Sequence, residues 1–401
     1  MTTRRIAPYL STTALLGAGL AVAFPYEALA NPEFDIRGRL QMDYHMIDED
    51  ETDFVDGFNN RRARLGMDGS IDEHWDGRVE INVAEGSVSA ADFRLRRSLG
   101  PGRLWLGQYK VPQGLNQLTS SNNYTFMERS SVSNIIPDSR RIGIAYEQTG
   151  DELGFKTMFF GRSLGDDEGE DDDVDHKDYR GNQPQGYAIR GVYAPFLTAS
   201  RHNEAPRLHL GASLVYEDQD DPLDIGFSDR PELRDGDGGS QRLIGTTVED
   251  VTDTTKLGLE AAYISGPLSA EAEYLTVSMN RDNGDEPTFS GWHVQGSYVL
   301  TGESRTYSTG GFGGVTPSGS GGAWELAARY SHMDLNDSGF AGGEQNNLTL
   351  GINYYASSNL RFMGNVVFAD VKDRREDGLP GGDVLPDESP TLVGFRAQYN
   401  W

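Results

Sequence analysis

TLVGFRAQYNW, the stretch at residues 391–401, decides the fold class of this chain. Every second residue from Val393 to Trp401 is apolar or aromatic, and the residues between them are glycine, arginine, glutamine and asparagine. Successive side chains of a β-strand point to opposite faces, so this segment has one apolar and one polar face. The pattern predicts a strand that meets an apolar medium on one side and water on the other.

The same alternation recurs along the whole chain. In the first segment of this kind, Phe34, Ile36 and Leu40 share one face, while Arg37 and Arg39 share the other. With the last stretch this makes about sixteen segments of roughly 9 to 12 residues, the length of a tilted strand that crosses a bilayer. The other alternating segments lie at residues 60–68, 74–83, 92–98, 103–111, 141–148, 152–162, 186–195, 207–217, 254–264, 267–278, 290–300, 323–333, 347–355 and 359–371. An even number of such strands predicts an all-β fold, a transmembrane antiparallel β-barrel of about 16 strands.

The composition agrees with a barrel. Only 37% of the 401 residues are hydrophobic and 49 are glycine. Low hydropathy is expected of a large barrel, because only alternate residues face lipid. A periplasmic β-propeller is the competing fold, but it would show a shared repeat of about 40 to 50 residues, and we find none. We therefore expect residues 31–401 to form a single outer-membrane β-barrel domain.

Residues 1–30 have the pattern of a bacterial export signal. Arg4 and Arg5 precede an apolar run from Ala14 to Phe24, and a small-x-small cleavage site ends at Ala30. The segment predicts a signal peptide that is removed on export, with an uncleaved N-terminal anchor as the alternative. Export and a barrel together predict a location in the bacterial outer membrane, with lipid around the barrel.

The distribution of charge narrows the possible functions. The formal net charge of −27 argues against a nucleic-acid partner, because phosphate backbones are bound by basic surfaces. Acidic residues concentrate at 48–56, 166–178 and 217–237, and we expect these runs to be solvated loops. The seven histidines show no metal-ligand spacing, and there is no Gly-x-Ser-x-Gly motif. We therefore predict no enzyme, no metal site and no cofactor.

Basic residues concentrate on the polar face of the first strands. If Phe34 faces lipid, then Arg39 faces the lumen, and Arg62 and Arg64 face it from the next strand. A narrow pore lined with arginine and lysine favours anions and repels cations. Alternatively, these arginines only pair with lumen acids and stiffen the wall. The other basic residues on this side are Arg37, Arg78, Arg94, Arg96, Lys110 and Arg141, and the acids available for pairing include Asp35, Asp43, Asp68, Asp76 and Glu80.

The segment from Val111 to Ser139, here called the constriction loop, differs from the other long loops in its low net charge. We expect it to fold into the barrel and to narrow the pore. Within it, Glu128 and Arg129 form a pair that could aim a guanidinium group into the pore. Arg61 has the parity of the lipid-facing residues, so it can reach the lumen only from a strand end or a bulge.

A set of short motifs carries a family resemblance over nearly the whole chain after the export signal. The motifs are GRLQMDY (38–44), NRRARL (60–65), GQYKVPQG (107–114), LTSSN (118–122), FMERS (126–130), LTGESRTY (300–307), GAWELAARYSHMDLND (322–337), TLGINYY (349–355) and VGFRAQYNW (393–401). In their order and spacing they resemble the phosphate-selective porin O and P family. The resemblance implies a sixteen-stranded homotrimeric porin with inward-folded loops and a narrow arginine- and lysine-rich eyelet that binds phosphate or polyphosphate.

The resemblance also implies which residues form the eyelet. Arg39 matches the family's arginine in the GRLQ motif. Arg61 and Arg62 match its Arg-Arg pair, and Arg129 matches the arginine that follows glutamate in its loop motif. These four residues are the first candidates for contact with a passing anion.

Three positions depart from the family pattern. Arg64 and Lys110 stand where similar members have an aromatic or acidic residue, so we add both to the predicted eyelet. Asn122 stands where phosphate-specific members have a lysine. The predicted function is passive diffusion of small anions, with inorganic phosphate or polyphosphate preferred. A general or cation-preferring diffusion porin with an acidic vestibule is the alternative, which the net charge and Asn122 favour.

Overall fold

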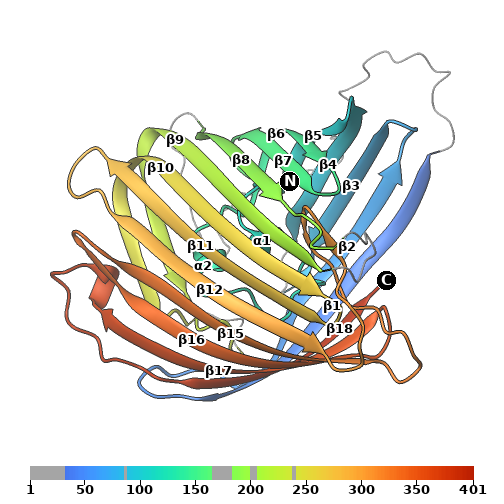
Figure 1. Cartoon of the computed structure of the whole chain (residues 1–401). Coiled ribbons are helices and arrows are strands. Elements are labelled where there is room, and N and C mark those ends of the chain that lie inside the picture. Colours follow the sequence, from blue (N-terminus) through green and yellow to red (C-terminus); the bar gives the residue numbers. More distant parts are fainter. Residues whose placement is uncertain (1–31, 85–87, 165–182, 199–205, 237–240) are drawn as a thin grey trace, which may run out of the picture.

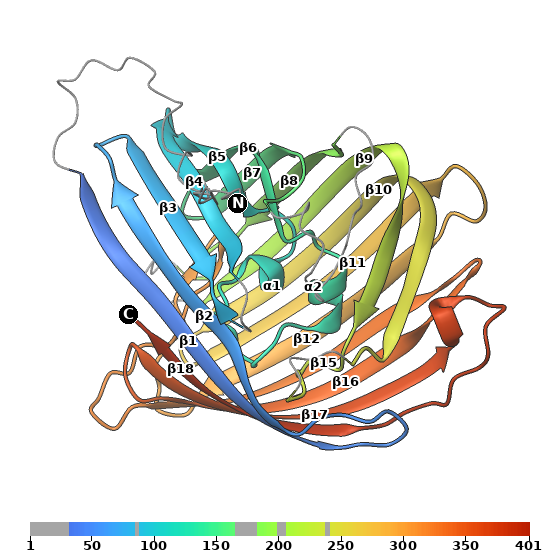
Figure 2. The same ribbon diagram turned by 180° about the vertical axis from the view of Figure 1, so that it is seen from behind.

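Sixteen antiparallel strands form a closed barrel in the computed structural model, which describes residues 32–84, 88–164, 183–198, 206–236 and 241–401. Barrel strands that follow one another in the chain are paired, and β18 pairs with β1 to close the ring (Figure 1, Figure 2). The barrel strands are β1 (Glu33–Asp48), β2 (Gly57–Ser70), β3 (Trp75–Asn82), β4 (Ser89–Leu99), β5 (Gly102–Lys110), β6 (Arg140–Thr149), β7 (Leu153–Phe160), β8 (Gln185–Tyr193), β9 (Arg207–Asp229), β10 (Ile244–Ser265), β11 (Leu268–Arg281), β12 (Thr288–Val299), β15 (Ala323–Asp337), β16 (Phe340–Tyr355), β17 (Leu360–Arg374) and β18 (Thr391–Asn400). They match the predicted segments one for one, so the predicted fold class is confirmed.

Two of the predicted segments fall outside the described residues: the signal peptide at 1–30 and the acidic run at 166–178. The acidic run at 48–56 is described, and each of its Asp and Glu side chains is exposed, as predicted. None of the described helices combines the length and the apolar character that crossing a membrane requires.

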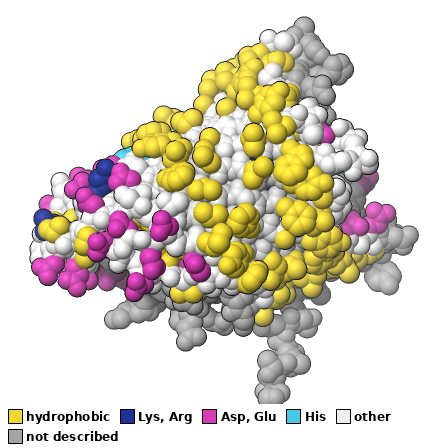
Figure 3. All heavy atoms as spheres, turned by 90° about the horizontal axis from the view of Figure 1, so that it is seen from below, with side chains coloured by type: hydrophobic (Ala, Val, Ile, Leu, Met, Phe, Trp, Pro, Cys, Tyr) yellow, Lys and Arg dark blue, Asp and Glu magenta, His cyan; other side chains and the backbone are white. Residues whose placement is uncertain are grey.

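The side chains alternate in the predicted sense. On β18, Phe395 and Tyr399 are exposed, whereas Arg396 is buried. On β1, Ile36 is exposed and Arg39 is buried. Figure 3 shows hydrophobic side chains spread over one face of the outer wall and acidic side chains gathered toward one end. The apolar faces of these strands therefore look outward to lipid, and the polar faces line the interior.

The seam between the first and last strands depends on a glycine. The Gly38 amide donates to the carbonyl oxygen of Trp401 at 3.0 Å, and the Trp401 amide donates back to Gly38 at 3.2 Å. A Cβ atom built on Gly38 would lie 1.9 Å from the indole ring of Trp401. Any larger residue at position 38 would therefore have to displace the aromatic side chain that covers the seam.

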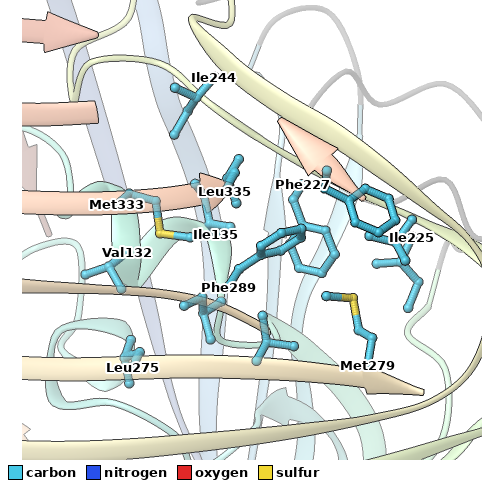
Figure 4. Close-up of a cluster of buried hydrophobic side chains, with 14 of the residues drawn as sticks. Val132, Ile135, Ile225, Phe227, Ile244, Leu275, Met279, Phe289, Met333 and Leu335 are labelled. Carbon is cyan, nitrogen blue, oxygen red and sulfur yellow. The ribbon is translucent and has the colours of Figure 1, made fainter. Parts of the chain in front are cut away.

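The constriction loop folds into the barrel, as predicted. Its short helices, α1 (Leu115–Leu118) and α2 (Ser131–Ile135), lie inside the ring of strands in both views (Figure 1, Figure 2). Val132 of α2 joins a buried apolar cluster that includes Phe289 of β12 and Met333 of β15 (Figure 4). Each apolar side chain of this size contributes about 1.5–3 kcal/mol when fully buried. Apolar packing thus holds the loop against one side of the wall.

A second segment also folds inward, and here the sequence prediction is wrong. The run 217–237 does not form one solvated loop, because its first part belongs to β9 and residues 230–235 are buried inside the barrel. The carboxylate of Glu232 accepts hydrogen bonds from Arg329 (2.9 Å) and from the hydroxyl of Thr349 (3.1 Å). Buried polar groups need such partners, and the barrel wall supplies them.

The glycine- and serine-rich stretch 302–322 connects β12 to β15 and also reaches the interior. It contains a small hairpin of β13 (Tyr307–Ser308) and β14 (Gly311–Phe312). Arg305 in this stretch donates to the carbonyl oxygen of Asn123 and to the hydroxyl of Thr125, both in the constriction loop. The interior is therefore filled by contacting segments from three separate connections.

Candidate functional site

One side of the barrel interior encloses a cavity of about 1270 Å³. Among the described residues, the lining comes mainly from β1–β10, the constriction loop and the segment after β9, and none of it from β11, β12 or β15–β18. Sixteen of these lining residues are Arg or Lys, and five are Asp or Glu. The wall therefore carries a surplus of positive charge. The structure brings all six predicted eyelet residues to this wall: Arg39, Arg61, Arg62, Arg64, Lys110 and Arg129.

Arg39 and Arg64 face each other across the pair of β1 and β2. Arg39 donates to the hydroxyl of Ser121 in the constriction loop, and no ion pair to Arg39 occurs within the described part of the chain. Arg64 donates to Glu80 at 3.0 Å. Like charges directly opposite each other repel, and Glu80 offsets part of that repulsion. The result is a local excess of positive charge on the wall.

Arg61 reaches the interior through a bulge. Gln41 pairs with Arg62 and Asp43 pairs with Asn59, so β2 has one residue more than β1 between these pairs. An extra residue shifts which side chains of the bulged strand face inward, and Arg61 needs such a shift to reach the lumen. Nε and Nη2 of Arg61 donate to the two carboxylate oxygens of Glu128 at 2.8 and 3.0 Å. This two-point geometry is the strong form of an arginine–carboxylate contact.

Arg129 lies in the constriction loop beside an aromatic ring. Its guanidinium carbon is 5.1 Å from the ring centre of Tyr124, and that of Arg62 is 6.0 Å from the same ring. Burial lowers the pKa of Arg129 below its ordinary value, although arginine remains protonated. The described residues offer Arg129 no ion pair. The face of the Tyr124 ring therefore stabilises its charge at close range, and the carboxylate of Glu128 does so from beyond ion-pair distance.

Lys110, at the end of β5, has a second role. Its Nζ donates to the carbonyl oxygens of Gln117 at 2.5 Å and of Thr119 at 3.0 Å. Carbonyl groups at the C-terminal end of a helical turn lack partners within the helix, and a lysine can satisfy them. Lys110 therefore anchors α1 while it lines the cavity.

Some arginines of the site pair with acidic residues of the lumen, which is the alternative role considered for them from the sequence. Arg78 donates to Asp68 at 2.5 Å, Arg37 to the same carboxylate at 3.2 Å, and Arg96 to Asp76 at 2.6 Å. These pairs join neighbouring strands near the turn between β2 and β3. The basic residues of the first four strands therefore divide into a paired group and a less compensated one.

Several lining residues were not singled out from the sequence. Arg190 and Lys256 have inward parity on their strands, so alternation could have found them. The others include Arg140, Lys156, Arg230 and Arg234. No sequence pattern marks Arg230 and Arg234 as lining residues, because both lie next to acidic residues in a run that resembles a solvated loop.

Acidic residues on the opposite wall hold the constriction loop. Glu271, Glu273 and His293 form a buried group whose potential ligand atoms lie within 4.8 Å of one another. Glu273 accepts hydrogen bonds from the amides of Leu115 and Asn116, and Glu271 accepts from His293 at 3.1 Å. The hydrogen bonds of this group join the wall to α1.

Comparisons with known proteins find similar sequences over most of the barrel. The model of the family described as phosphate-selective porin O and P matches residues 34–401. An uncharacterised protein of Caulobacter vibrioides is 30% identical over 359 residues, which is 84% of this chain and 69% of that protein. Porin O of Pseudomonas aeruginosa is 27% identical over 334 residues, which is 76% of this chain and 73% of that protein.

Solved structures share the fold at low sequence identity. A loop-deletion mutant of OmpT, an outer membrane protein of Vibrio cholerae, is 13% identical with a TM-score of 0.58 and covers 92% of this chain and 99% of its own. A trimer form of OmpT is also 13% identical, with a TM-score of 0.57 and the same coverage. The outer membrane channel DcaP of Acinetobacter baumannii is 12% identical with a TM-score of 0.55 and covers 92% of this chain and 97% of its own.

Proposed function

Since the chain belongs to the phosphate-selective porin O and P family, we propose that it lets small anions, with inorganic phosphate or polyphosphate preferred, diffuse passively through its arginine-lined cavity. Family and fold make it a channel of the bacterial outer membrane rather than an enzyme. The choice of ion, the six eyelet residues and the assembly are the parts proposed here.

The charge of the cavity wall carries the proposal. Basic residues outnumber acidic ones by sixteen to five among the described lining residues. Arg39 and Arg129, from a strand and from the constriction loop, contribute charge without an ion pair in the described chain. In a narrow passage between low-dielectric walls, such charge lowers the energy of an anion and raises that of a cation.

The donor groups favour an oxyanion over a halide. A guanidinium group offers several N–H donors in a fixed plane, which suits the oxygen atoms of phosphate. The hydroxyl-bearing residues Ser120 and Ser121 line the same cavity, whereas Asn122 does not. The lysine that Asn122 replaces would add charge but no planar set of donors. Recognition by arginine and hydroxyl groups therefore does not depend on position 122.

The remaining expectations follow the family. A homotrimer embedded in outer-membrane lipid is proposed, since a trimer form exists for a protein of the same fold. Residues 1–30 are proposed to be a signal peptide, and residues 31–401 the barrel domain. No nucleic-acid partner, metal or cofactor is part of this function.

A general or cation-preferring diffusion porin with an acidic vestibule is the second candidate. The exposed acidic run at 48–56 and the 62 Asp and Glu residues against 35 Lys and Arg favour it. Acidic residues at the mouth would attract cations to the entrance. The two candidates differ in which charges dominate, those of the mouth or those of the cavity wall.

Reversal potentials in planar bilayers separate these candidates. With purified protein in a KCl gradient, we expect the sign of an anion-selective pore, and we expect added phosphate to block the chloride current. A potential of the opposite sign would support the acidic-vestibule porin. A correctly folded protein with no conductance would instead indicate a structural or adhesive barrel.

A further inference from the structure

One acidic side chain lies behind the arginines of the cavity wall. Arg61 and Arg62 line the cavity, whereas Glu128 does not. In addition to the two bonds from Arg61, the carboxylate of Glu128 accepts from Arg62 at 3.4 Å and from Arg396 of β18 at 2.7 Å. A single carboxylate of the constriction loop is therefore shared by three guanidinium groups from two strands.

The charges around Glu128 depend on it for their balance. Arg396 already has a carboxylate partner, because its Nε and Nη2 donate to Asp43 at 2.7 and 2.6 Å. Glu128 is thus available to offset the charges of Arg61 and Arg62. Burial alone would raise the pKa of Glu128, but the guanidinium groups of Arg61, Arg62 and Arg396 bring it well below its usual value. The three guanidinium groups therefore favour the ionised form of this side chain.

Glu128 and Arg129 are adjacent in the chain but make different contacts. Glu128 contacts the arginines of β2 and β18, while Arg129 stacks on Tyr124 and lines the cavity. The backbone carbonyl of Glu128 also accepts from Arg329 at 3.0 Å, which holds this part of the loop independently of the Glu128 side chain. A change of charge at position 128 can therefore leave Arg129 where it is.

We propose that Glu128 is a specificity-determining residue of the pore, which holds Arg61 and Arg62 in place and limits how strongly they attract anions. The inference rests on the proposed function. A conducting site must attract an ion strongly enough to admit it and weakly enough to release it. With Nε and Nη2 of Arg61 directed at Glu128, fewer donors of that guanidinium group face the cavity. Glu128 thus sets how tightly the site binds an anion, without contacting the anion.

The substitution Glu128→Gln removes the charge and keeps the size of the side chain. We expect the phosphate concentration that halves the chloride current to fall about three- to tenfold, because the offsetting charge next to two lining arginines is gone. The chloride-to-potassium permeability ratio should rise in parallel. Glu128→Asp keeps the charge and should stay close to the wild type in both measurements, which a purely structural role would not predict.

Glu325→Gln is the matched control. Glu325 is buried, pairs with Arg305 at 3.3 Å and does not line the cavity, so this variant loses an equivalent paired charge away from the site. It should leave the half-blocking phosphate concentration unchanged. If Glu128→Gln does not assemble, the comparison of Arg61→Gln with Arg61→Gln/Glu128→Gln replaces it. The double variant should bind phosphate about three- to tenfold more tightly than the single one.

The outcomes separate this inference from the proposed function. Suppose that the wild type is anion-selective. If Glu128→Gln, alone or added to Arg61→Gln, then leaves the half-blocking phosphate concentration unchanged or raises it, the inference is overturned and the proposed function stays intact. A wild type without anion preference overturns both.

Discussion

The two sides of the barrel interior treat charge in opposite ways. The filled side consists of β11, β12 and β15–β18 under the inward-folded segments, and the open side is the wall of the cavity. On the filled side, three buried arginines meet carboxylates: Arg329 meets Glu232 (2.5 Å), Arg305 meets Glu325 (3.3 Å) and Arg396 meets Asp43 (2.6 Å). On the open side, Arg39 and Arg129 have no such partner among the described residues.

Solvation explains the difference between the two sides. A charge packed against protein on all sides costs several kcal/mol unless an opposite charge and hydrogen bonds compensate it. Arg129, which is only partly buried beside the cavity, keeps part of its hydration, whereas Arg39 is buried and donates to the hydroxyl of Ser121. Surplus charge therefore gathers on the open side. Arg361 of β17 is an exception on the filled side: it has no ion pair in the described chain, donates to the carbonyl oxygen of Thr125 and stacks on Tyr355. Arg39 and Arg129 line the cavity and Arg361 does not, so the cavity wall is where unpaired charge can face an anion.

The largest expected effect is on the filled side. Arg329→Met leaves the carboxylate of Glu232 buried without its cation, and we expect the free energy of unfolding to fall by about 3–5 kcal/mol. Urea unfolding in detergent micelles measures this loss. Adding Glu232→Leu should restore part of the stability, because no uncompensated charge then remains. A single variant as stable as the wild type would mean that the filled side does not depend on pairing.

The next effect concerns selectivity on the open side. We expect Arg39→Gln together with Arg129→Gln to lower the chloride-to-potassium permeability ratio about tenfold, since each charge acts in a narrow passage, and to change stability little. Bilayer reversal potentials provide the measurement. Arg97→Gln is the control, because Arg97 is exposed, does not line the cavity and stacks on Trp75. An unchanged ratio in the double variant would place selectivity outside these two residues.

A smaller effect separates paired from unpaired arginines within the open side. Arg129→Gln should reduce the permeability ratio about threefold more than Arg62→Gln does, because Glu128 already offsets part of the Arg62 charge. Both variants are compared under the same KCl gradient. Equal effects would show that pairing with Glu128 does not change the electrostatic potential that the permeating ion meets.

The smallest expected effect is on a half-exposed pair of the open side. Asp68 accepts from Arg37 and Arg78, but its side chain keeps 39% of its exposure. Partly solvated ion pairs contribute little, so Asp68→Asn should lower the free energy of unfolding by less than about 1 kcal/mol. Urea unfolding beside Arg329→Met tests the contrast directly. A loss as large as that of Arg329→Met would remove the energetic distinction between the two sides.

The sequence could predict the site only as far as strand parity and motifs reach. Alternation correctly placed Arg39, Arg62 and Arg64 on the inner face, and the required bulge at Arg61 is present. In the sequence, Glu128 stands out only as the neighbour of Arg129. Its role depends on Arg61, Arg62 and Arg396 reaching the same carboxylate, and no local pattern reports that three distant segments meet.

The sequence by itself determined the barrel, the strands and the face of each strand, because alternation is a property of the backbone at each residue and its immediate neighbours. Only the tertiary structure decided which charges pair and which stay open to the cavity. Arg396 and Glu128 are 268 positions apart, and residues 230–235 enter the interior despite an acidic composition. Pairing depends on distances of a few ångströms between segments that meet only when the barrel closes and its connections fold inward, because both the attraction of opposite charges and the cost of burying them depend on that geometry.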